Sequence, residues 1–350
     1  MKRLSVVVIS LFIIVLMTTQ AFPVSEAGVL FLLISPGVRA DGMGEAFVAI
    51  ADDVTATYWN PGGLAFQTGR EMFLMHSNWL PQLTNDLFYD YAAYKHHIYG
   101  LGTFGISVTY LNLGQQVITG ETGPEELGTF SSYDAAAALS YGTQMTENIG
   151  MGVSLRMIYS NLAPIGAGAE QGKGQTWAFC FDIGILYRDF FLRGLNFGAN
   201  LANVGPKITY IDADQADPLP TNLKFGFAYR IVDGEYNRLT ASIDVNKLLV
   251  RRHKDGTSDP VYKALFTSWA DDTPEEEFRK MIAHIGAEYW YNNMIALRAG
   301  YWHDEEGKVK PWTFGFGLRY SLYELDFGYI AAGEGHPLTD TMRLSLQIGF

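Results

Sequence analysis

Cysteine is almost absent from this sequence, and so is any excess of positive charge. Cys180 is the only cysteine among 350 residues, which excludes an intramolecular disulfide, so the fold alone must stabilise the chain. The formal net charge is −12 at pH 7, and an acidic chain is repelled by the phosphates of nucleic acid. Disulfide-stabilised scaffolds and nucleic-acid-binding proteins are therefore disfavoured classes.

Long apolar runs are also missing beyond residues 4–17, and the mean hydropathy is only +0.03. The sequence therefore offers no series of membrane-spanning helices. The single run, LSVVVISLFIIVLM, follows Lys2 and Arg3 and precedes a small-x-small site at Ser25 and Ala27. This order predicts a secretory signal peptide over residues 1–27, cleaved after Ala27, with an uncleaved anchor helix as the alternative.

Aromatic residues and glycine are abundant instead. Phe, Trp and Tyr make up 14% of the chain, which also contains 37 glycines. In the stretch PWTFGFGLRY, Phe314 and Phe316 share one face of a strand, whereas Gly315 and Gly317 share the other. The stretches TNLKFGFAYRI and TWAFCFDIGILYR alternate in the same way. Repeated alternating segments in an exported, aromatic-rich chain are typical of an outer-membrane β-barrel.

The connections between the alternating segments differ in length by parity. Long ones such as 249–280 alternate with short ones such as Asn292, as in barrels with short periplasmic turns and long outer loops. We therefore predict an all-β fold, a transmembrane antiparallel β-barrel of about 14 strands over residues 71–350. It would lie in the outer membrane of a Gram-negative type bacterium, in contact with lipid, with both termini in the periplasm. The predicted strands are 71–79, 88–96, 103–112, 131–142, 149–161, 175–188, 194–203, 221–231, 237–248, 281–291, 293–302, 311–320, 321–331 and 341–350.

The last predicted strand ends on an apolar series. Leu344, Leu346, Ile348 and Phe350 share one face, which we expect to meet lipid while the strand pairs with the first one. An alternating C-terminal strand that ends in Phe also resembles the signal read by the bacterial barrel-assembly machinery. The resemblance implies that these four residues act as an assembly signal.

The opposite face of the strands is expected to line the lumen. It carries many charges, which a hydrated or plugged lumen can pair across strands but a dry core could not tolerate. Its many glycines, including Gly152, Gly184 and Gly198, leave space for something inside. The predicted lumen charges are Arg156, Asp182, Arg230, Glu288, Arg298, Arg319 and Asp326, together with Asp244, Glu324 and Arg343.

Residues 28–70 do not alternate. We predict a compact N-terminal plug at the periplasmic mouth, with a short helix over about 45–52, and an ordinary N-terminal strand with a loop is the alternative. Asn before Pro disfavours helix, and two glycines permit left-handed angles, so a turn is expected at Asn60, Pro61, Gly62 and Gly63.

The stretch GVRADGMGEAFVAIADDVTATYWNPGGLAF resembles the N-terminal segment of the PorV/PorQ family, outer-membrane barrels related to FadL-type long-chain fatty acid transporters. NWLPQLTNDLFYDYAAY, NVGPKITY, DVNKLLV and IGAEYWYNNMIALRAGYW extend the resemblance, in order, to Phe350. It implies a fourteen-strand barrel in type IX secretion. There it would bind substrates bearing a C-terminal secretion domain, beside a large translocon and a surface peptidase. Gly62 departs from the family, which usually has Ala after Asn-Pro.

The loop 249–280 is the most individual of the long connections. Thr273, Pro274 and Glu276 predict a helix start, because they supply an N-cap, a first-turn proline and a capping-box glutamate. Tyr262, Phe266 and Trp269, with Leu265, are expected to form an apolar cluster. The cluster would either cap the barrel or form a docking surface for a partner.

No motif points to catalysis, a cofactor or a metal. The GxGxxG match at 100–105 opens an alternating strand rather than a helix, and the P-loop-like stretch near Lys173 has Ala167 in place of the first glycine. His96 and His97 fall at a predicted turn without other ligands nearby. We therefore expect no enzyme activity.

Two functions fit the predicted fold. One is an interaction protein of type IX secretion, and the other is a FadL-like channel for long-chain fatty acids or other hydrophobic molecules. A continuous apolar pocket with a lateral gap would favour transport, whereas a lumen closed by charges and plug would favour docking. The polar lumen favours docking, and a purely structural barrel is a third possibility.

Overall fold

The computed structural model describes residues 27–120, 123–163, 173–211, 215–253, 255–270 and 272–350. The predicted signal peptide, apart from Ala27, lies outside these residues, and so does Ala167 of the P-loop-like stretch. Among the helices within the described ranges, none has both the length and the apolar character needed to cross a bilayer.

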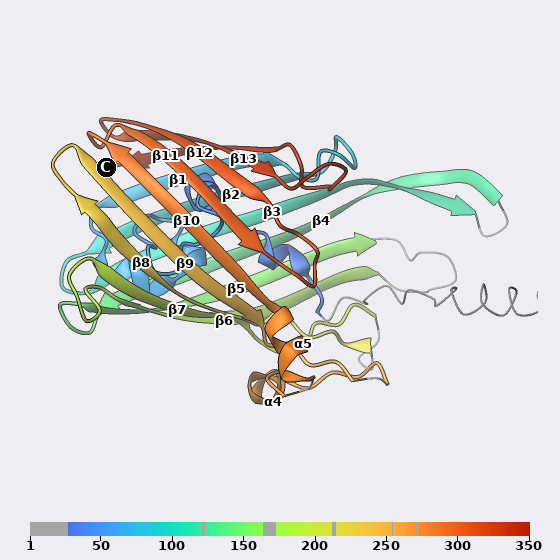
Figure 1. Ribbon diagram of the computed structural model, residues 1–350. Helices are drawn as coiled ribbons and strands as arrows, with labels where there is room; N and C mark the ends of the chain where they lie inside the picture. Colours follow the sequence, from blue (N-terminus) through green and yellow to red (C-terminus); the bar gives the residue numbers. More distant parts are fainter. Residues whose placement is uncertain (1–26, 121–122, 164–172, 212–214, 254, 271) are drawn as a thin grey trace, which may run out of the picture.

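Fourteen antiparallel strands close into one barrel, as predicted, with every strand beside its neighbours in sequence (Figure 1). The first and last strands complete the ring, with Met72 opposite Ile348 and Leu74 opposite Leu346. The strands are β1 (Arg70–Asn78), β2 (Phe88–Ile98), β3 (Gly102–Gly120), β4 (Gly123–Gln144), β5 (Ile149–Ala163), β6 (Gly174–Tyr187), β7 (Leu195–Val204), β8 (Asn222–Asp233), β9 (Asn237–Leu248), β10 (Met281–Tyr291), β11 (Ile295–His303), β12 (Trp312–Tyr320), β13 (Tyr323–Ala331) and β14 (Thr341–Gly349).

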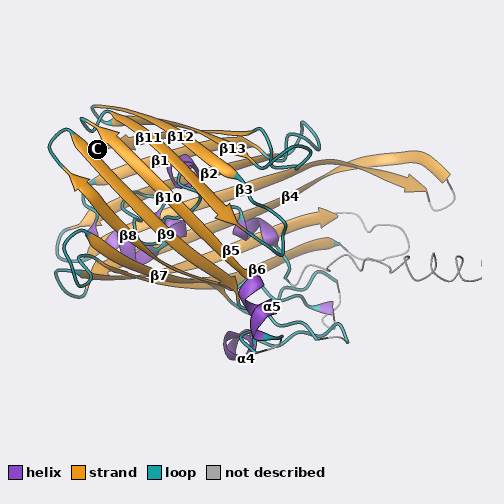
Figure 2. Cartoon of the chain, viewed as in Figure 1, coloured by secondary structure: helices purple, strands orange, loops and turns teal. Residues whose placement is uncertain are grey.

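The two ends of the barrel differ, as the parity of the connections predicted. The short connections gather at one end together with Phe350, and the long connections gather at the other (Figure 2). We call the first the turn end and the second the loop end. The turn end comprises residues 99–101, 145–148, 188–194, 234–236, 292–294, 321–322 and Phe350.

The prediction of a long loop over residues 113–130 is wrong. β3 and β4 continue through most of it as a hairpin that projects beyond the barrel wall at the loop end (Figure 1). The pairing shifts between Asn112 and Gln115, where Gly114 has a φ of +76°. This β-bulge interrupts the period-2 alternation, so the sequence pattern ends before the strand does.

The two faces of the strands follow the predicted alternation. Phe314 and Phe316 are exposed on the outer face, where lipid would cover them, whereas Cys180 is buried on the inner face. On β14, Leu344 and Phe350 are exposed, and Leu346 and Ile348 are half-buried. The Phe350 N–H donates to the Arg70 carbonyl over 2.8 Å, so the pairing runs to the last residue. The role of this series in assembly stays a prediction.

The N-terminal segment, Ala27–Gly69, runs through the lumen. Its helices are short: η1 (Leu30–Leu33), α2 (Val38–Gly42), α3 (Ala56–Trp59) and η2 (Pro61–Phe66). The prediction of a helix over residues 45–52 is wrong. Glu45 has a left-handed φ of 64°, and Val48 donates its N–H to the Asp244 carboxylate over 2.7 Å instead of to a helical carbonyl. Polar groups of the barrel wall thus replace the hydrogen bonds of a helix.

The facing of β12 can be tested with Phe316→Arg. An arginine on the lipid face near the membrane midplane costs about 2–4 kcal/mol, so the folded, heat-modifiable barrel should be strongly depleted. Phe316→Leu keeps an apolar side chain and should preserve the yield. Equal yields of the two variants would show that the outer face of β12 is assigned wrongly.

Candidate functional site

The N-terminal segment sits against the barrel wall at positions occupied by glycine. A Cβ added at Gly300 would lie 2.0 Å from the Gly44 nitrogen, and one at Gly152 would lie 2.2 Å from the Pro61 carbonyl carbon. No side chain fits there unless the backbone moves. Gly317 differs, because its missing Cβ leaves room for the Asp326 carboxylate and the Arg298 guanidinium. The wall glycines in closest contact with the backbone of the segment are Gly142, Gly150, Gly152, Gly184, Gly198, Gly286, Gly300 and Gly315.

The predicted turn at Asn60, Pro61, Gly62 and Gly63 lies in the lumen against β6. The Asn60 side-chain amide donates to the carbonyls of Val48, over 2.8 Å, and Ile185, over 2.9 Å. Its oxygen accepts from the Gly62 N–H over 3.0 Å, which caps the 3₁₀ turn η2. The turn therefore ties two parts of the segment to the wall.

The segment also reaches further than the expected plug at one mouth. The Gly28 N–H donates to the Pro218 carbonyl over 3.0 Å in a connection of the loop end. At the other extreme, the Gly69 carbonyl accepts from His97, beside the turn end. The segment therefore spans the lumen between the two ends.

Arg39 of α2 is the central charge of this contact. Its guanidinium makes a bidentate pair with Glu288 of β10, with both N–O distances at 2.7 Å. It also reaches Asp52 over 2.6 Å and Asp53 over 3.1 Å within the segment. Glu288, which is 3% exposed, accepts in turn from Arg298 of β11 over 2.7 Å. The pairing joins the segment to two neighbouring strands.

The predicted lumen charges continue this network. Arg298 also pairs with Asp326 and with Glu324, the latter over 3.4 Å, and Arg319 reaches Glu324 over 2.6 Å. These groups come from β11, β12 and β13, so the ion pairs cross the wall strand by strand. The structure therefore brings five of the predicted residues together: Glu288, Arg298, Arg319, Glu324 and Asp326.

The other predicted charges lie apart from this network. Arg156 of β5 pairs with Asp182 of β6 over 2.8 Å. Arg230 pairs with Asp233 over 3.3 Å near the turn end. Arg343 of β14 donates to Asp41 over 2.6 Å and to the Ser35 carbonyl over 2.7 Å, which makes a second bond between wall and segment.

Two cavities flank the segment. One, of about 530 Å³, lies toward the turn end and is lined by Arg39, Asp52 and charged wall residues. The other, of about 420 Å³, lies toward the loop end and has mostly apolar walls, among them Trp79 and Trp302. Among the described residues, none lines both cavities.

The loop-end cavity contains polar atoms without partners. Lys224 lines it, with its ammonium 4.4 Å from the Trp59 ring centre, and makes no ion pair or hydrogen bond within the described part of the chain. The Asn222 side-chain oxygen and the Arg343 Nε also lack hydrogen-bond partners there. Lys224 and Arg39 were not predicted from the sequence, because a single charge gives no pattern of its own, whether it lies on β8 or in the short helix α2.

The loop 249–280 contains α4 (Val261–Thr267) and α5 (Pro274–Arg279). The predicted helix start is confirmed, with a capping box between Thr273 and Glu276. Asp259 anchors α4, because its carboxylate accepts from Lys263 over 2.7 Å and from Thr267 over 2.8 Å. Hydrogen bonds from Lys263 and His253 hold the pKa of Asp259 well below its usual range.

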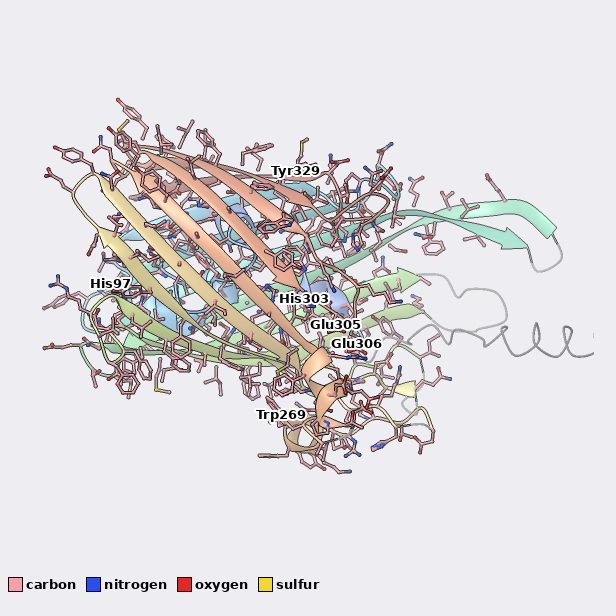
Figure 3. The ribbon with its side chains drawn as sticks, viewed as in Figure 1. His97, Trp269, His303, Glu305, Glu306 and Tyr329 are labelled. Carbon is pink, nitrogen blue, oxygen red and sulfur yellow. The ribbon has the colours of Figure 1, made fainter. Side chains whose placement is uncertain are left out.

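The prediction of an apolar cluster in this loop is wrong. Tyr262 is 72% exposed and Phe266 is 79% exposed, because α4 turns Ala264 inward and these two residues outward. Trp269 is 40% exposed and lies near the Lys247 ammonium. It lies far from His97, which is beside the turn end (Figure 3). The loop therefore carries uncovered aromatic surface at the loop end.

Within the described residues, no group of three or more His, Cys, Asp or Glu could hold a metal ion. His284 and Glu288 share a strand face but not a bond, since His284 contacts the Gly44 carbonyl and Asn246.

The closed barrel is similar in fold to solved transporters. It is similar to the toluene transporter TbuX of Ralstonia pickettii, with a TM-score of 0.54, 16% identity and coverage of 91% of this chain and 100% of that one. It is also similar to the toluene transporter TodX of P. putida, with a TM-score of 0.57, 14% identity and coverage of 90% and 99%. Among curated proteins, none matches this chain. The fold therefore defines the class of this chain as a closed antiparallel β-barrel of fourteen strands.

The sequence places the chain more narrowly within that class. Residues 18–255 match the family described as type IX secretion system protein PorV. The match spans more than half of the chain, so the chain belongs to the PorV family. The resemblance found in the sequence is thereby confirmed.

Glu288→Gln tests the bond between segment and wall. Removing one partner of a buried ion pair leaves Arg39 and Arg298 less compensated and should cost about 3–5 kcal/mol of unfolding free energy. Glu305→Gln, at an exposed position, should change it by about 0.5 kcal/mol or less. Denaturant unfolding and protease cleavage of residues 27–69 would measure both effects. A segment equally protected in both variants would contradict the anchoring role.

Proposed function

We propose that this protein acts in type IX secretion by binding substrates and partners at its loop end, not by conducting them through its lumen. The filled lumen carries this proposal, since the segment is held by buried ion pairs to β10 and β14. Family membership supports it, because the PorV family is described as a component of the type IX secretion system. The turn end, where Phe350 lies, would then face the periplasm. The expectation of two periplasmic termini does not fit this orientation, because Gly28 is hydrogen-bonded to Pro218 at the loop end.

The partners would be the translocon, the surface peptidase and the C-terminal domains of cargo. Exposed aromatics on α4 suit such contacts, because burying apolar surface contributes about 25 cal/mol per Å². Tyrosine is enriched among the residues that dominate the binding energy of an interface, and phenylalanine is enriched in interface cores. We propose that Tyr262 and Phe266 contact a partner directly and that Trp269 holds the loop against Lys247. The barrel-assembly machinery would bind the β14 series during biogenesis.

Tyr262→Ser combined with Phe266→Ser tests the docking role. Both side chains are largely exposed, so the barrel should fold normally while cargo export and co-purification of the translocon fall about tenfold or more. The matched control is Tyr99→Ser with Phe191→Ser, which removes the same two side-chain types, 96% and 89% exposed, at the turn end. Undiminished export in a folded loop variant would refute the docking role of α4.

A second function is supported by the loop-end cavity. The cavity has apolar walls and Lys224, which forms no ion pair with any described residue, and this combination suits a hydrophobic molecule with an anionic head, such as a long-chain fatty acid. In this case the barrel would bind or pass hydrophobic molecules. The continuous strand pairing around the wall and the segment in the lumen argue against a simple pore.

Lys224→Gln tests this second function. A hydrogen bond to a charged group contributes about 1.5–3 kcal/mol, so oleate binding should weaken about tenfold or more. Lys308→Gln, at an exposed position outside the cavity, should leave it unchanged. If the unaltered protein does not bind oleate, the cavity has no such role and the docking function stands alone.

A further inference from the structure

The cavity at the turn end has a different chemistry from the rest of the lumen. It occupies about 530 Å³, and Arg39, Asp52 and Asp53 of the N-terminal segment line its inner side. Its wall carries four more guanidinium groups, which come from the turn after β6 and from β8, β9 and β12. These are Arg188, Arg230, Arg238 and Arg319.

Aromatic rings hold two of these guanidinium groups. Arg319 lies 4.3 Å from the Trp290 ring centre, and Arg188 lies 4.1 Å from the Phe66 ring centre. Arg238 pairs with Trp290 in the strand register, which brings it beside Arg319. A guanidinium stacked on a ring keeps its N–H edge available for an oxygen ligand.

The carboxylates that line the cavity have partners other than Arg188, Arg230 and Arg238. Asp52, Asp53 and Glu288 contact Arg39. Glu71 pairs with Lys95 over 3.3 Å, and Asp189 accepts from the Gly194 N–H over 2.6 Å.

Arg188 and Arg238 consequently form no ion pair with any described residue. Arg230 has only Asp233, at 3.3 Å, with both side chains about half exposed. Three guanidinium groups therefore face one cavity without a carboxylate of that cavity bound to them.

We propose that this turn-end cavity binds an acidic peptide segment of another protein through Arg188, Arg230 and Arg238. A single exposed ion pair contributes little, so one small anion would bind weakly there. A peptide that carries several carboxylates binds more tightly, because once the first ion pair has formed the others form within the same complex. The planar guanidinium forks match carboxylates, which favours Asp and Glu side chains as the ligand.

Fluorescein-labelled tetraglutamate is the probe, and the protein is the full barrel in a neutral detergent. Arg188→Gln with Arg238→Gln should weaken binding about tenfold, and added salt should weaken binding to the unaltered protein. Arg193→Gln with Lys308→Gln is the matched control. It removes the same formal charge at exposed positions outside the cavity and should bind as the unaltered protein does. Heat modifiability would confirm that each variant is folded.

Three outcomes would overturn the proposal. The unaltered protein could fail to bind tetraglutamate at millimolar concentration. The control could lose as much affinity as the cavity variant, which would show general attraction to positive charge. Citrate could bind as tightly as tetraglutamate, which would identify a small-anion site. None of these results depends on the secretion role or on contacts at the loop end.

Discussion

The bidentate pair between Arg39 and Glu288 is the interaction on which the arrangement of the lumen depends. Glu288 is buried and the Arg39 side chain is only 14% exposed, and a charge removed from water is tolerated only when a partner of opposite sign compensates its lost hydration. Without the N-terminal segment, Glu288 would still pair with Arg298, but Arg343 would lose Asp41, its partner in the segment. The wall and the segment are therefore parts of one electrostatic unit, and the glycines opposite Gly44 and Pro61 make the close approach possible.

The barrel could be predicted from the sequence because its physical cause is local. Each strand faces lipid on one side, so alternation recurs along TNLKFGFAYRI and PWTFGFGLRY whatever the distant contacts are. The failures have equally physical causes. Residues 45–52 look helical, but Asp244 and Ser242 of the wall satisfy their backbone groups. At Gly114 a bulge ends the alternation although the β3–β4 pairing continues.

The site was less predictable than the fold. Strand alternation correctly put Glu288, Arg298 and Asp326 on the inner face, because facing depends only on parity. The pairing of Glu288 with Arg39 could not be predicted, because the two residues are 249 positions apart and the path of the segment through the lumen leaves no period in the sequence. The exposure of Tyr262 and Phe266 depends on how one short helix is turned. Lys224 and Arg238 are single charges, and the sequence does not reveal that neither forms an ion pair with a described residue; Arg238 donates a hydrogen bond to Asn293, and Lys224 lies over the Trp59 ring.

The bond between Arg343 and Asp41 bears on how the ring stays closed. β1 and β14 join the two ends of a chain of nearly three hundred residues, so their pairing carries the largest loop-closure entropy of any neighbouring strands, although this cost grows slowly with length. Arg343 fastens β14 to Asp41, and Glu71 on β1 accepts from the Val54 N–H over 2.7 Å. The segment therefore binds both strands of this junction from inside the barrel and stabilises the pairing that closes the ring.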